Sequence, residues 1–446
     1  MSDAAPTTLY FISDLHIGGD GALAKCKFEA ELVEFLRKVA EGPQPAEILI
    51  VGDAFGFWEL TEEPGVGTKL DTIVANHPDL FRQMRETGEH CRITLLPGNH
   101  DYDLACVPAY ADALALHGIR LEPVESLQRK VAGRTIWIEH GQQHDEFNRS
   151  PEFGNRWALP FGYWVTSGIV ASAGKSAEGT RSRWLDDVES VQPNQDIPYW
   201  VLSNHFYKEI TPWLRWGTLP FLLLFGLSAA LFWLRAAERL TGYHSPIFEI
   251  DLQPLLGFPG RVLDFVQFVN SAVLATLLVL AIPGLFLLRN VRRALERFGL
   301  WREDGLALDQ DGDYVTAARR IFAEHPDVAV YVYGHTHTPS QKEVDGRLVL
   351  NTGSWLKRLE HVPVRLGRLP GVWVPSYCLN WFEITEDAGA IRIRHAVAVA
   401  DAGAIRIRYR VVSKEPPRDL TLLERLLILG RRPPPLPAIP AETRIA

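Results

Sequence analysis

The chain has 446 residues, of which 47% are hydrophobic and 22% charged. This composition excludes a disordered, collagen-like or fibrous protein, and the length allows roughly two to three domains. The formal net charge of -8 provides no basic excess to neutralise a nucleic-acid backbone, so we expect no nucleic acid as a partner. The four cysteines form no CxxC pair, which argues against a disulfide scaffold or a thiolate zinc site and fits a reducing compartment.

Short strand-like segments occur in two blocks of the sequence. Each segment rises through β-branched or aromatic residues and ends on glycine or a polar residue. Strands in two blocks with helices between them predict an α/β layered sandwich flanked by helices, with its first half at 1–150 and its second half at 303–412. The segments are TLYFISD, EILIVGD, RITLLPG and RTIWIEHG in the first block, and VAVYVYGH, RLVLNTGSW and CLNWFEI in the second.

The intervening residues, 151–302, contain two long runs without a charge, 216–234 and 265–288. Their lengths are 19 and 24 residues. At about 1.5 Å per residue, a helix of this length reaches across a hydrocarbon core of roughly 30 Å. The runs therefore predict a helical insertion with a two-span membrane hairpin. Two alternatives remain: a pair of buried core helices, or a hairpin that lies on the bilayer without crossing it.

Basic residues around the two runs predict the orientation of the hairpin. Lys208 and Arg215 precede the first run and five arginines follow the second, whereas the loop between the runs holds only three arginines. By the positive-inside tendency, both halves of the α/β domain lie on the cytoplasmic side of the cell inner membrane. The N-terminal residues lack a basic segment followed by an apolar core, so no secretory signal is expected. The arginines are Arg289, Arg292, Arg293, Arg297 and Arg302 after the second run, and Arg235, Arg239 and Arg261 in the loop.

Three smaller features complete the organisation of the chain. Gly226, Ser228, Ala229 and Ala230 offer a small-residue surface through which spans could pair, so a homo-oligomer is possible. The octapeptide DAGAIRIR at 387–394 recurs at 401–408, and its alternation predicts two strands of an edge hairpin. In the tail, 413–446, a short apolar helix in LLERLLIL precedes the proline-rich RRPPPLPAIP, and we expect a partly extended, loosely attached end.

Polar residues that suit metal chemistry follow five of the expected strands. Loops at one edge of an α/β sheet could bring these residues together. They supply imidazoles, carboxylates and one amide carbonyl, a donor set that suits manganese, iron or zinc. The residues are Asp14 and His16 in SDLHIGG, Asp53 in VGDAFGFWE, Asn99, His100 and Asp101 in PGNHDYD, His140 in EHGQQHD, and His335 and His337 in YGHTHTP.

In this order, the five segments resemble the signature of the calcineurin-like metallophosphoesterase superfamily: D-x-H, GD, GNH[DE], a His-Gly, and GHxH. The resemblance covers residues 8 to about 141 and 325 to about 385. It implies two divalent ions, most often Mn²⁺, with Fe or Zn as alternatives. It also implies the ligands: Asp14, His16 and His337 for one ion, Asn99, His140 and His335 for the other, and Asp53 as the bridge.

Two ions about 3.5 to 4 Å apart lower the pKa of water and draw charge from phosphoryl oxygens, so the resemblance implies a metal-dependent phosphoester or pyrophosphate hydrolase. His100 is then the candidate general acid. Asp101 could orient its ring, although a turn or helix-cap role for Asp101 is also open. We consider Trp58, His144, Asp145, Asn148 and Arg149 as possible substrate contacts, or as residues in ion-pair or capping roles.

Within the superfamily, VGDAFGFWE and GHTHTP most resemble the UDP-2,3-diacylglucosamine diphosphatase branch, whose substrate is lipid-linked. Those relatives commonly carry an acidic residue where this chain has Gly56, and arginine at the position of His100. From this resemblance and the predicted hairpin, we expect hydrolysis of a phosphodiester or pyrophosphate bond in a phosphorylated amphiphile at the cytoplasmic membrane face. One alternative is a membrane-anchored enzyme for a soluble nucleotide or small phosphate ester, and another is an inactive membrane scaffold.

Overall fold

The structure is a computed structural model, and its chain divides into two compact units, Met1–Ser203 with Ala307–Ala446, and Asn204–Leu306. The described residues are 8–18, 24–60, 68–167, 190–191, 196–210, 223, 225–230, 233–234, 237–238, 240–242, 257–297, 301–302, 305–306, 311–364, 369–386, 405–416, 420–433 and 438–445.

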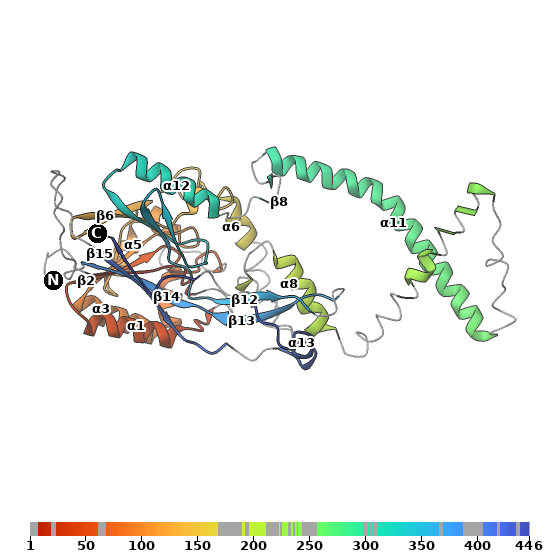
Figure 1. The fold of residues 1–446 in the computed structure, drawn as a ribbon, viewed down its shortest axis with the longest axis horizontal. Helices are drawn as coiled ribbons and strands as arrows, with labels where there is room; N and C mark the ends of the chain where they lie inside the picture. The colour runs from red at the N-terminus through yellow and green to blue at the C-terminus, as the bar shows by residue number, and fades with distance from the viewer. Residues whose placement is uncertain are drawn as a thin grey trace. The chain divides into compact units, whose positions relative to one another are not determined.

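Two sheets form the centre of the first unit (Figure 1). The larger has seven strands in the order β16-β15-β14-β1-β2-β3-β4, and the smaller has five in the order β10-β11-β9-β6-β5. Their strands are β1 (Thr8–Ile12), β2 (Ala46–Val51), β3 (Arg92–Leu96), β4 (Ile119–Leu121), β14 (Leu379–Glu386), β15 (Ile405–Val412) and β16 (Glu442–Ile445), and then β5 (Ser126–Val131), β6 (Arg134–Glu139), β9 (Val328–Tyr333), β10 (Ser340–Val344) and β11 (Arg347–Asn351).

The two sheets pack face to face, and helices cover their outer faces. Alternate residues of β1 and β2 point to opposite sides, as the two-residue period of a strand requires. Phe11 and Leu49 belong to the core between the sheets, whereas Ile12 and Ile48 belong to the core under the helices. On the large sheet these helices are α1 (Glu29–Glu41), α2 (Thr68–Asn76), α3 (Pro78–His90) and α5 (Ala109–Ala115), and on the small sheet α12 (Asp311–Glu324).

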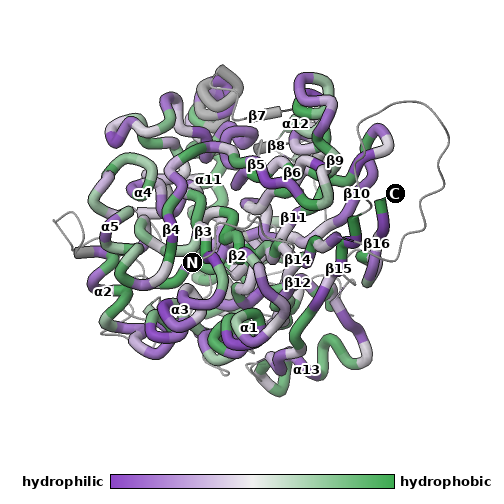
Figure 2. Tube along the Cα trace, turned by 90° about the vertical axis from the view of Figure 1, so that its left-hand side faces the viewer, coloured by the Kyte–Doolittle hydropathy of each residue, from purple (hydrophilic) through white to green (hydrophobic). Residues whose placement is uncertain are grey.

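Figure 2 shows the resulting distribution of hydropathy, with hydrophobic strands inside and hydrophilic stretches on the covering helices. The predicted α/β layered sandwich is therefore confirmed. All seven predicted strand segments contain a strand, namely β1, β2, β3, β6, β9, β11 and β14. The central strands run parallel, β1 with β2, β2 with β3, and β6 with β9. Their carboxyl ends consequently meet at common edges of the two sheets.

A separate hairpin, β12 (Lys357–Val362) with β13 (Val372–Tyr377), lies at the root of the insertion. Helix α8 (Ile197–Asn204) packs on it, because Trp200 is buried against Leu359 and Trp373. The hydroxyl of Ser203 donates a hydrogen bond of 2.6 Å to the carbonyl of Gly371. The compact second unit thus begins at Asn204, later in the chain than the insertion that we predicted from residue 151.

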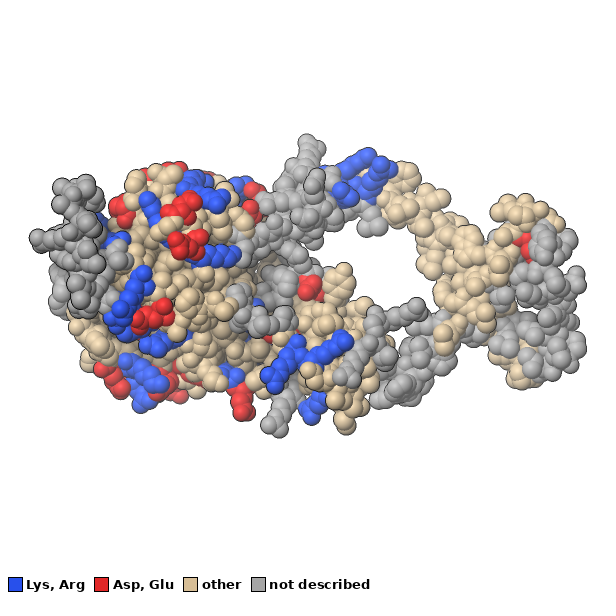
Figure 3. All heavy atoms as spheres, in the orientation of Figure 1, with Lys and Arg blue, Asp and Glu red and all other residues tan. Residues whose placement is uncertain are grey.

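The second unit contains the long helix α11 (Phe258–Arg297), which includes the second predicted run. Residues Phe258–Leu287 are long and apolar enough to cross a membrane, and only 6% of their most apolar window is buried. Figure 3 shows an uncharged length of α11 with basic side chains gathered beyond it. Length and composition allow a span but are weak evidence for one.

The first predicted run, 216–234, lies largely outside the described residues. Its described positions, 223, 225–230 and 233–234, are helical. The amide of Asn270 in α11 donates a hydrogen bond of 3.2 Å to the hydroxyl of Ser228, and both side chains are buried. In the part of the chain that the structure describes there is one candidate span rather than the two that the sequence predicted.

The C-terminal region joins the large sheet. The first DAGAIRIR copy lies outside the described residues, and the second ends in β15, where Ile405 and Ile407 are buried. Helix α13 (Leu422–Leu427) begins with a capping box between Thr421 and Glu424. Strand β16 pairs with β15, so the end of the chain forms an edge strand and is not loosely attached as the sequence suggested.

The inter-sheet core makes Phe382 a test of the sandwich. Its side chain is fully buried, it pairs with Phe11 across β14 and β1, and its ring lies 5.1 Å from that of Tyr409. We expect Phe382→Ala to lower the stability of this unit by about 3–5 kcal/mol, because the cavity cannot collapse between two sheets. The measurement is the thermal midpoint in detergent. Leu116→Ala, at an exposed position, is the control, and an equal shift in both variants would contradict the packing.

Candidate metal centre

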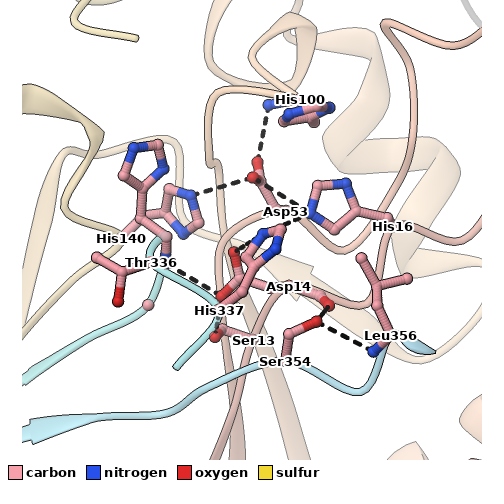
Figure 4. A network of polar contacts seen from close by, with 12 residues as sticks. Ser13, Asp14, His16, Asp53, His100, His140, Thr336, His337, Ser354 and Leu356 are labelled. Carbon is pink, nitrogen blue, oxygen red and sulfur yellow. Dashed lines mark hydrogen bonds and ion pairs between the residues drawn. The ribbon is translucent and has the colours of Figure 1, made fainter. Parts of the chain in front are cut away.

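The candidate ligands follow the carboxyl ends of five strands from both sheets. Asp14 and His16 follow β1, Asp53 follows β2, and Asn99 follows β3. From the small sheet, His140 follows β6, and His335 and His337 follow β9. Figure 4 shows side chains from both sheets pointing toward one another around Asp53. The structure therefore places all seven predicted ligands at one site.

Five of the predicted ligands have left-handed backbone angles, which residues other than glycine rarely adopt. The values of φ are 52° at Asp14, 42° at His16, 49° at Asp53, 69° at His335 and 55° at His337. Such residues cost of order 1–3 kcal/mol each and persist where their surroundings fix them. Here the amides of Leu15 and His16 both donate to the carbonyl of Asp53, at 2.9 and 3.0 Å.

Glycines in the motifs allow this close approach of the loops. A Cβ atom at Gly98 would lie 2.2 Å from Oδ1 of Asp53. One at Gly52, which has a φ of +80°, would lie 2.3 Å from Nδ1 of His140. The GD and GNHD motifs thus need glycine because a side chain there would displace a candidate ligand.

One cluster that could hold an ion consists of Asp14, His16 and His337. Nε2 of His337 lies 3.3 Å from Oδ1 of Asp14 and 3.2 Å from Nε2 of His16. The other carboxylate oxygen, Oδ2 of Asp14, accepts from the hydroxyl of Ser13 and from the amide of His335. Oδ1 is buried without a hydrogen bond, which leaves it oriented for a cation.

A second cluster consists of Asp53, His140 and His335. Nδ1 of His140 donates to the carbonyl of Val51 at 2.8 Å, which makes Nε2 the atom available to a metal. This Nε2 lies 3.2 Å from the amide oxygen of Asn99, so the predicted amide ligand faces the same point. Nε2 of His335 contacts Oδ2 of Asp145 at 3.0 Å.

Asp53 connects the two clusters. Its Oδ2 atom lies 3.2 Å from Nε2 of His140 in the second cluster and 3.7 Å from Nε2 of His16 in the first. Its Oδ1 atom accepts a 2.7 Å hydrogen bond from the amide of His100. One buried carboxylate oxygen between two sets of imidazoles is the arrangement that a shared ligand of two ions requires.

The charges of the site favour bound cations. Burial alone would raise the pKa of Asp53, but the nearby His140 and His100 outweigh burial and hold it well below its ordinary value. Burial would lower the pKa of His140, but Asp53 and Asp14 raise it to about 9. Burial and the neighbouring His100 hold the pKa of His16 well below its usual range. Two buried carboxylates are costly unless positive charge compensates them. Divalent ions bound by these nitrogen and oxygen donors would provide that charge.

A model of the calcineurin-like phosphoesterase family matches residues 7–197. The matched residues make up less than half of the chain and are similar to that family. Together with the His/Asp clusters, the match supports a metal-dependent phosphoesterase domain in this chain. No curated protein matches the chain.

Several solved structures have weak similarity to this chain. A single mutant of Vps29 from Entamoeba histolytica is 11% identical, with 91% of this chain and 92% of that chain covered and a TM-score of 0.26. A predicted phosphoesterase from Streptococcus pneumoniae TIGR4 is 11% identical, with 94% and 96% covered and a TM-score of 0.26. Phosphopantetheinyl hydrolase from Mycobacterium tuberculosis is 13% identical, with 78% and 90% covered and a TM-score of 0.24. Similarity at this level identifies no function for the chain.

At this site, the candidate acid His100 is oriented by a residue that sequence reasoning missed. Nδ1 of His100 lies 2.6 Å from Oε1 of Glu59, whose side chain is buried. Asp101 contacts backbone instead: its carboxylate accepts from the amides of Ala54, Phe55 and Gly98 at 2.7, 3.2 and 2.6 Å. This matches the turn role that we left open for Asp101.

The position of Gly56 explains how Glu59 reaches the site. A Cβ atom at Gly56 would lie 2.9 Å from Oε2 of Glu59, so the carboxylate occupies the space next to this glycine. Gly56 departs from the pattern of the motifs that the sequence resembles. This departure was the available signal, because Glu59, three residues later, fills the space beside the glycine.

The residues considered as substrate contacts have structural partners. Asp145 contacts His335, and the side-chain amide of Asn148 donates a 2.6 Å hydrogen bond to Asp145. His144 contacts Glu139 at 2.6 Å, and Arg149 forms an exposed ion pair with Glu146 at 3.0 Å. The ring of Trp58 lies 4.5 Å from that of His100. Asp145 and Asn148 thus hold the second cluster, and Trp58 lies beside the candidate acid.

Removing one histidine from each cluster tests the metal assignment. We expect the wild-type chain to retain about two Mn²⁺ ions after dialysis. His335→Ala and His337→Ala should each lower this content toward one, because each removes a ligand from a different cluster. Metal analysis by mass spectrometry is the measurement, and His90→Ala, at an exposed histidine, should be unchanged. A full complement of ions in both variants would sink the assignment.

The contact between Glu59 and His100 predicts a change in kcat. Glu59→Ala should lower kcat roughly 10- to 100-fold while KM and metal content change little, because Glu59 orients a ring and does not reach the ions. Glu59→Asp should keep more activity than Glu59→Ala. Steady-state kinetics on a chromogenic phosphodiester supplies the measurement. Loss of metal in Glu59→Ala would show instead that Glu59 supports the cluster.

Proposed function

We propose that the protein is a two-metal phosphoesterase that hydrolyses a phosphodiester or pyrophosphate bond in a lipid-linked substrate at the cytoplasmic membrane face. The observation that carries the reaction class is the Oδ2 atom of Asp53, which lies between His140 and His16 and so links two ligand clusters. The substrate class is supported by the motif resemblance to UDP-2,3-diacylglucosamine diphosphatases and by the apolar length of α11.

Two divalent ions in this site would supply water of lowered pKa and neutralise charge on the phosphoryl oxygens. Asp14, His16 and His337 would hold one ion, Asn99, His140 and His335 the other, and Asp53 both. The protein fixes these ligands in advance: the carbonyl of Val51 sets the tautomer of His140, and Asp145 holds the ring of His335.

His100 performs the proton transfer to the leaving group in this proposal. Glu59 holds Nδ1 of the ring, so Nε2 is the atom that gives the proton to the departing oxygen. The amide of His100 donates to Asp53, which fixes the loop against the ligand that both ions share. The ring of Trp58 packs on His100 and limits the access of water.

Membrane attachment is part of the proposal. Helix α11 supplies the candidate span, and the first run, 216–234, would supply the other helix of a membrane hairpin. The buried hydrogen bond between Asn270 and Ser228 supports such pairing, because a polar contact holds helices together in lipid. Manganese is the ion that we propose. We also propose that the small residues of the first run allow a homo-oligomer to form.

Two rival functions follow from the same residues. In the first, α11 only anchors the chain and the substrate is a soluble nucleotide or small phosphate ester. In the second, the chain is an inactive membrane scaffold, which the complete set of ligands at one site argues against. The rivals differ in metal content and in the substrate that is turned over.

A phosphorus-detected screen of lipid and nucleotide phosphates, with Mn²⁺ and detergent-dispersed protein, separates these functions. We expect hydrolysis of lipid-linked diesters or pyrophosphates to exceed that of nucleotides by at least about tenfold in kcat/KM, which corresponds to about 1.4 kcal/mol of binding to the apolar part. Asp53→Asn is the inactive control. Faster turnover of nucleotides supports the soluble-substrate rival, and no turnover of any phosphate supports the scaffold.

The orientation of the hairpin is tested by tagging the loop between the runs, at 236–264. Because the basic residues lie mainly outside this loop, we expect a tag there to be inaccessible from the cytoplasm in intact cells. A tag at the N-terminus is the control and should be accessible from the cytoplasm. Cytoplasmic accessibility of the loop tag would contradict the two-span topology.

A further inference from the structure

We propose that an aromatic ridge on the phosphoesterase unit, formed by Trp157, Phe161 and Trp164, docks on the surface of a lipid bilayer beside the metal centre. The exposed fractions of these side chains are 85%, 47% and 63%. Three large aromatic side chains exposed within eight residues are unusual for a water-facing surface. The proposal goes beyond the proposed function, because it concerns a surface that neither the ligands nor α11 contains.

The ridge is attached rigidly to the unit. Phe161 and Trp164 lie on helix α6 (Phe161–Val165), and the amide of Gly162 donates 2.8 Å to the carbonyl of Phe147. The rings of Phe161 and Phe147 are 5.5 Å apart, and a Cβ atom at Gly162 would lie 2.1 Å from Oδ1 of Asn148. Helix α6 therefore packs closely on residues 147–148.

Two short paths connect the ridge to the metal centre. Along the first, the ring of Trp164 lies 5.2 Å from Tyr163, Tyr163 lies 5.6 Å from Trp58, and Trp58 lies 4.5 Å from His100. Along the second, Gly162 of α6 lies beside Asn148. The side-chain oxygen of Asn148 accepts a 3.5 Å hydrogen bond from the side-chain amide of Asn99. Helix α6, with Phe161 and Trp164, thus lies at the margin of the site that would receive a phosphorylated substrate.

The residue types favour a bilayer surface as the partner. Tryptophan and other aromatic rings prefer the level of the lipid headgroups, where the ring meets apolar chains and its polar edge meets water. The guanidinium of Arg156 lies 5.6 Å from the ring centre of Trp157, and no acidic partner for it occurs among the described residues. A cation beside an exposed tryptophan complements the phosphate of a lipid headgroup. The candidate span in the same chain would keep a bilayer within reach.

The test uses the full chain reconstituted into phosphatidylcholine–phosphatidylglycerol bilayers, with either brominated or ordinary acyl chains. The emission of the Trp157→Phe/Trp164→Phe variant is subtracted from that of the wild type, which isolates the two ridge tryptophans. We expect this difference emission to fall several-fold in brominated bilayers, because bromine quenches rings that lie in the interface. Trp381→Phe supplies the matched control, since Trp381 packs on Phe35 of α1 and its difference emission should not change.

Equal difference emission in brominated and ordinary bilayers overturns the proposal. A difference emission that bromine does not quench but that varies with protein concentration also overturns the proposal. This result would identify the ridge as a contact between copies of the chain. Unchanged thermal midpoints verify that the variants fold. Hydrolysis of a soluble chromogenic diester by the same wild-type preparation reports the proposed function separately, so a failure of one proposal can be distinguished from a failure of the other.

Discussion

The buried carboxylate of Asp53 is the group on which the rest of the site depends. It lies in the protein interior with Asp14 nearby, and burial of two negative charges costs several kcal/mol per ion unless positive charge compensates it. The surrounding imidazoles compensate in part, which is why the pKa of His140 rises to about 9 despite burial. A pair of divalent ions would replace that proton and neutralise both carboxylates. Bound cations would thus stabilise the ligand set, and metal binding would be linked to local order.

The sandwich explains why this site tolerates a long insertion. Strands β6 and β9 are parallel neighbours, so the insertion lies in the crossover between two adjacent strands. The chain leaves through α6, which packs on residues 147–148, and returns through α12, whose Tyr314 lies near Gly141. Because loop-closure free energy grows only slowly with loop length, lengthening the connection costs little. The sandwich can therefore keep its ligands together with a long insertion between these strands.

The sequence predicted the strands and ligands because both follow from local patterns. Strands such as β2, buried along its whole length, appear as continuous apolar runs, and the ligand motifs come directly after them. Glu59 was missed because it reaches His100 through a loop whose shape depends on the absence of a side chain at Gly56. The hairpin β12–β13 and the edge strand β16 were missed because they are stabilised by distant partners: Trp200 packs on the hairpin and β15 pairs with the edge strand. Tertiary contacts of this kind leave no periodic pattern in the sequence.

The same topology relates the insertion to the candidate site. The insertion leaves the sandwich at the edge where His140 lies, and α6 is the first helix beyond that edge. If the proposed ridge docks on a bilayer, this margin of the site would lie at the lipid surface. For a substrate with its phosphate in water and its chains in lipid, this placement would raise the encounter rate without any additional contact to the ions. Because α6 packs closely on Asn148, the docked ridge would hold the site near the bilayer.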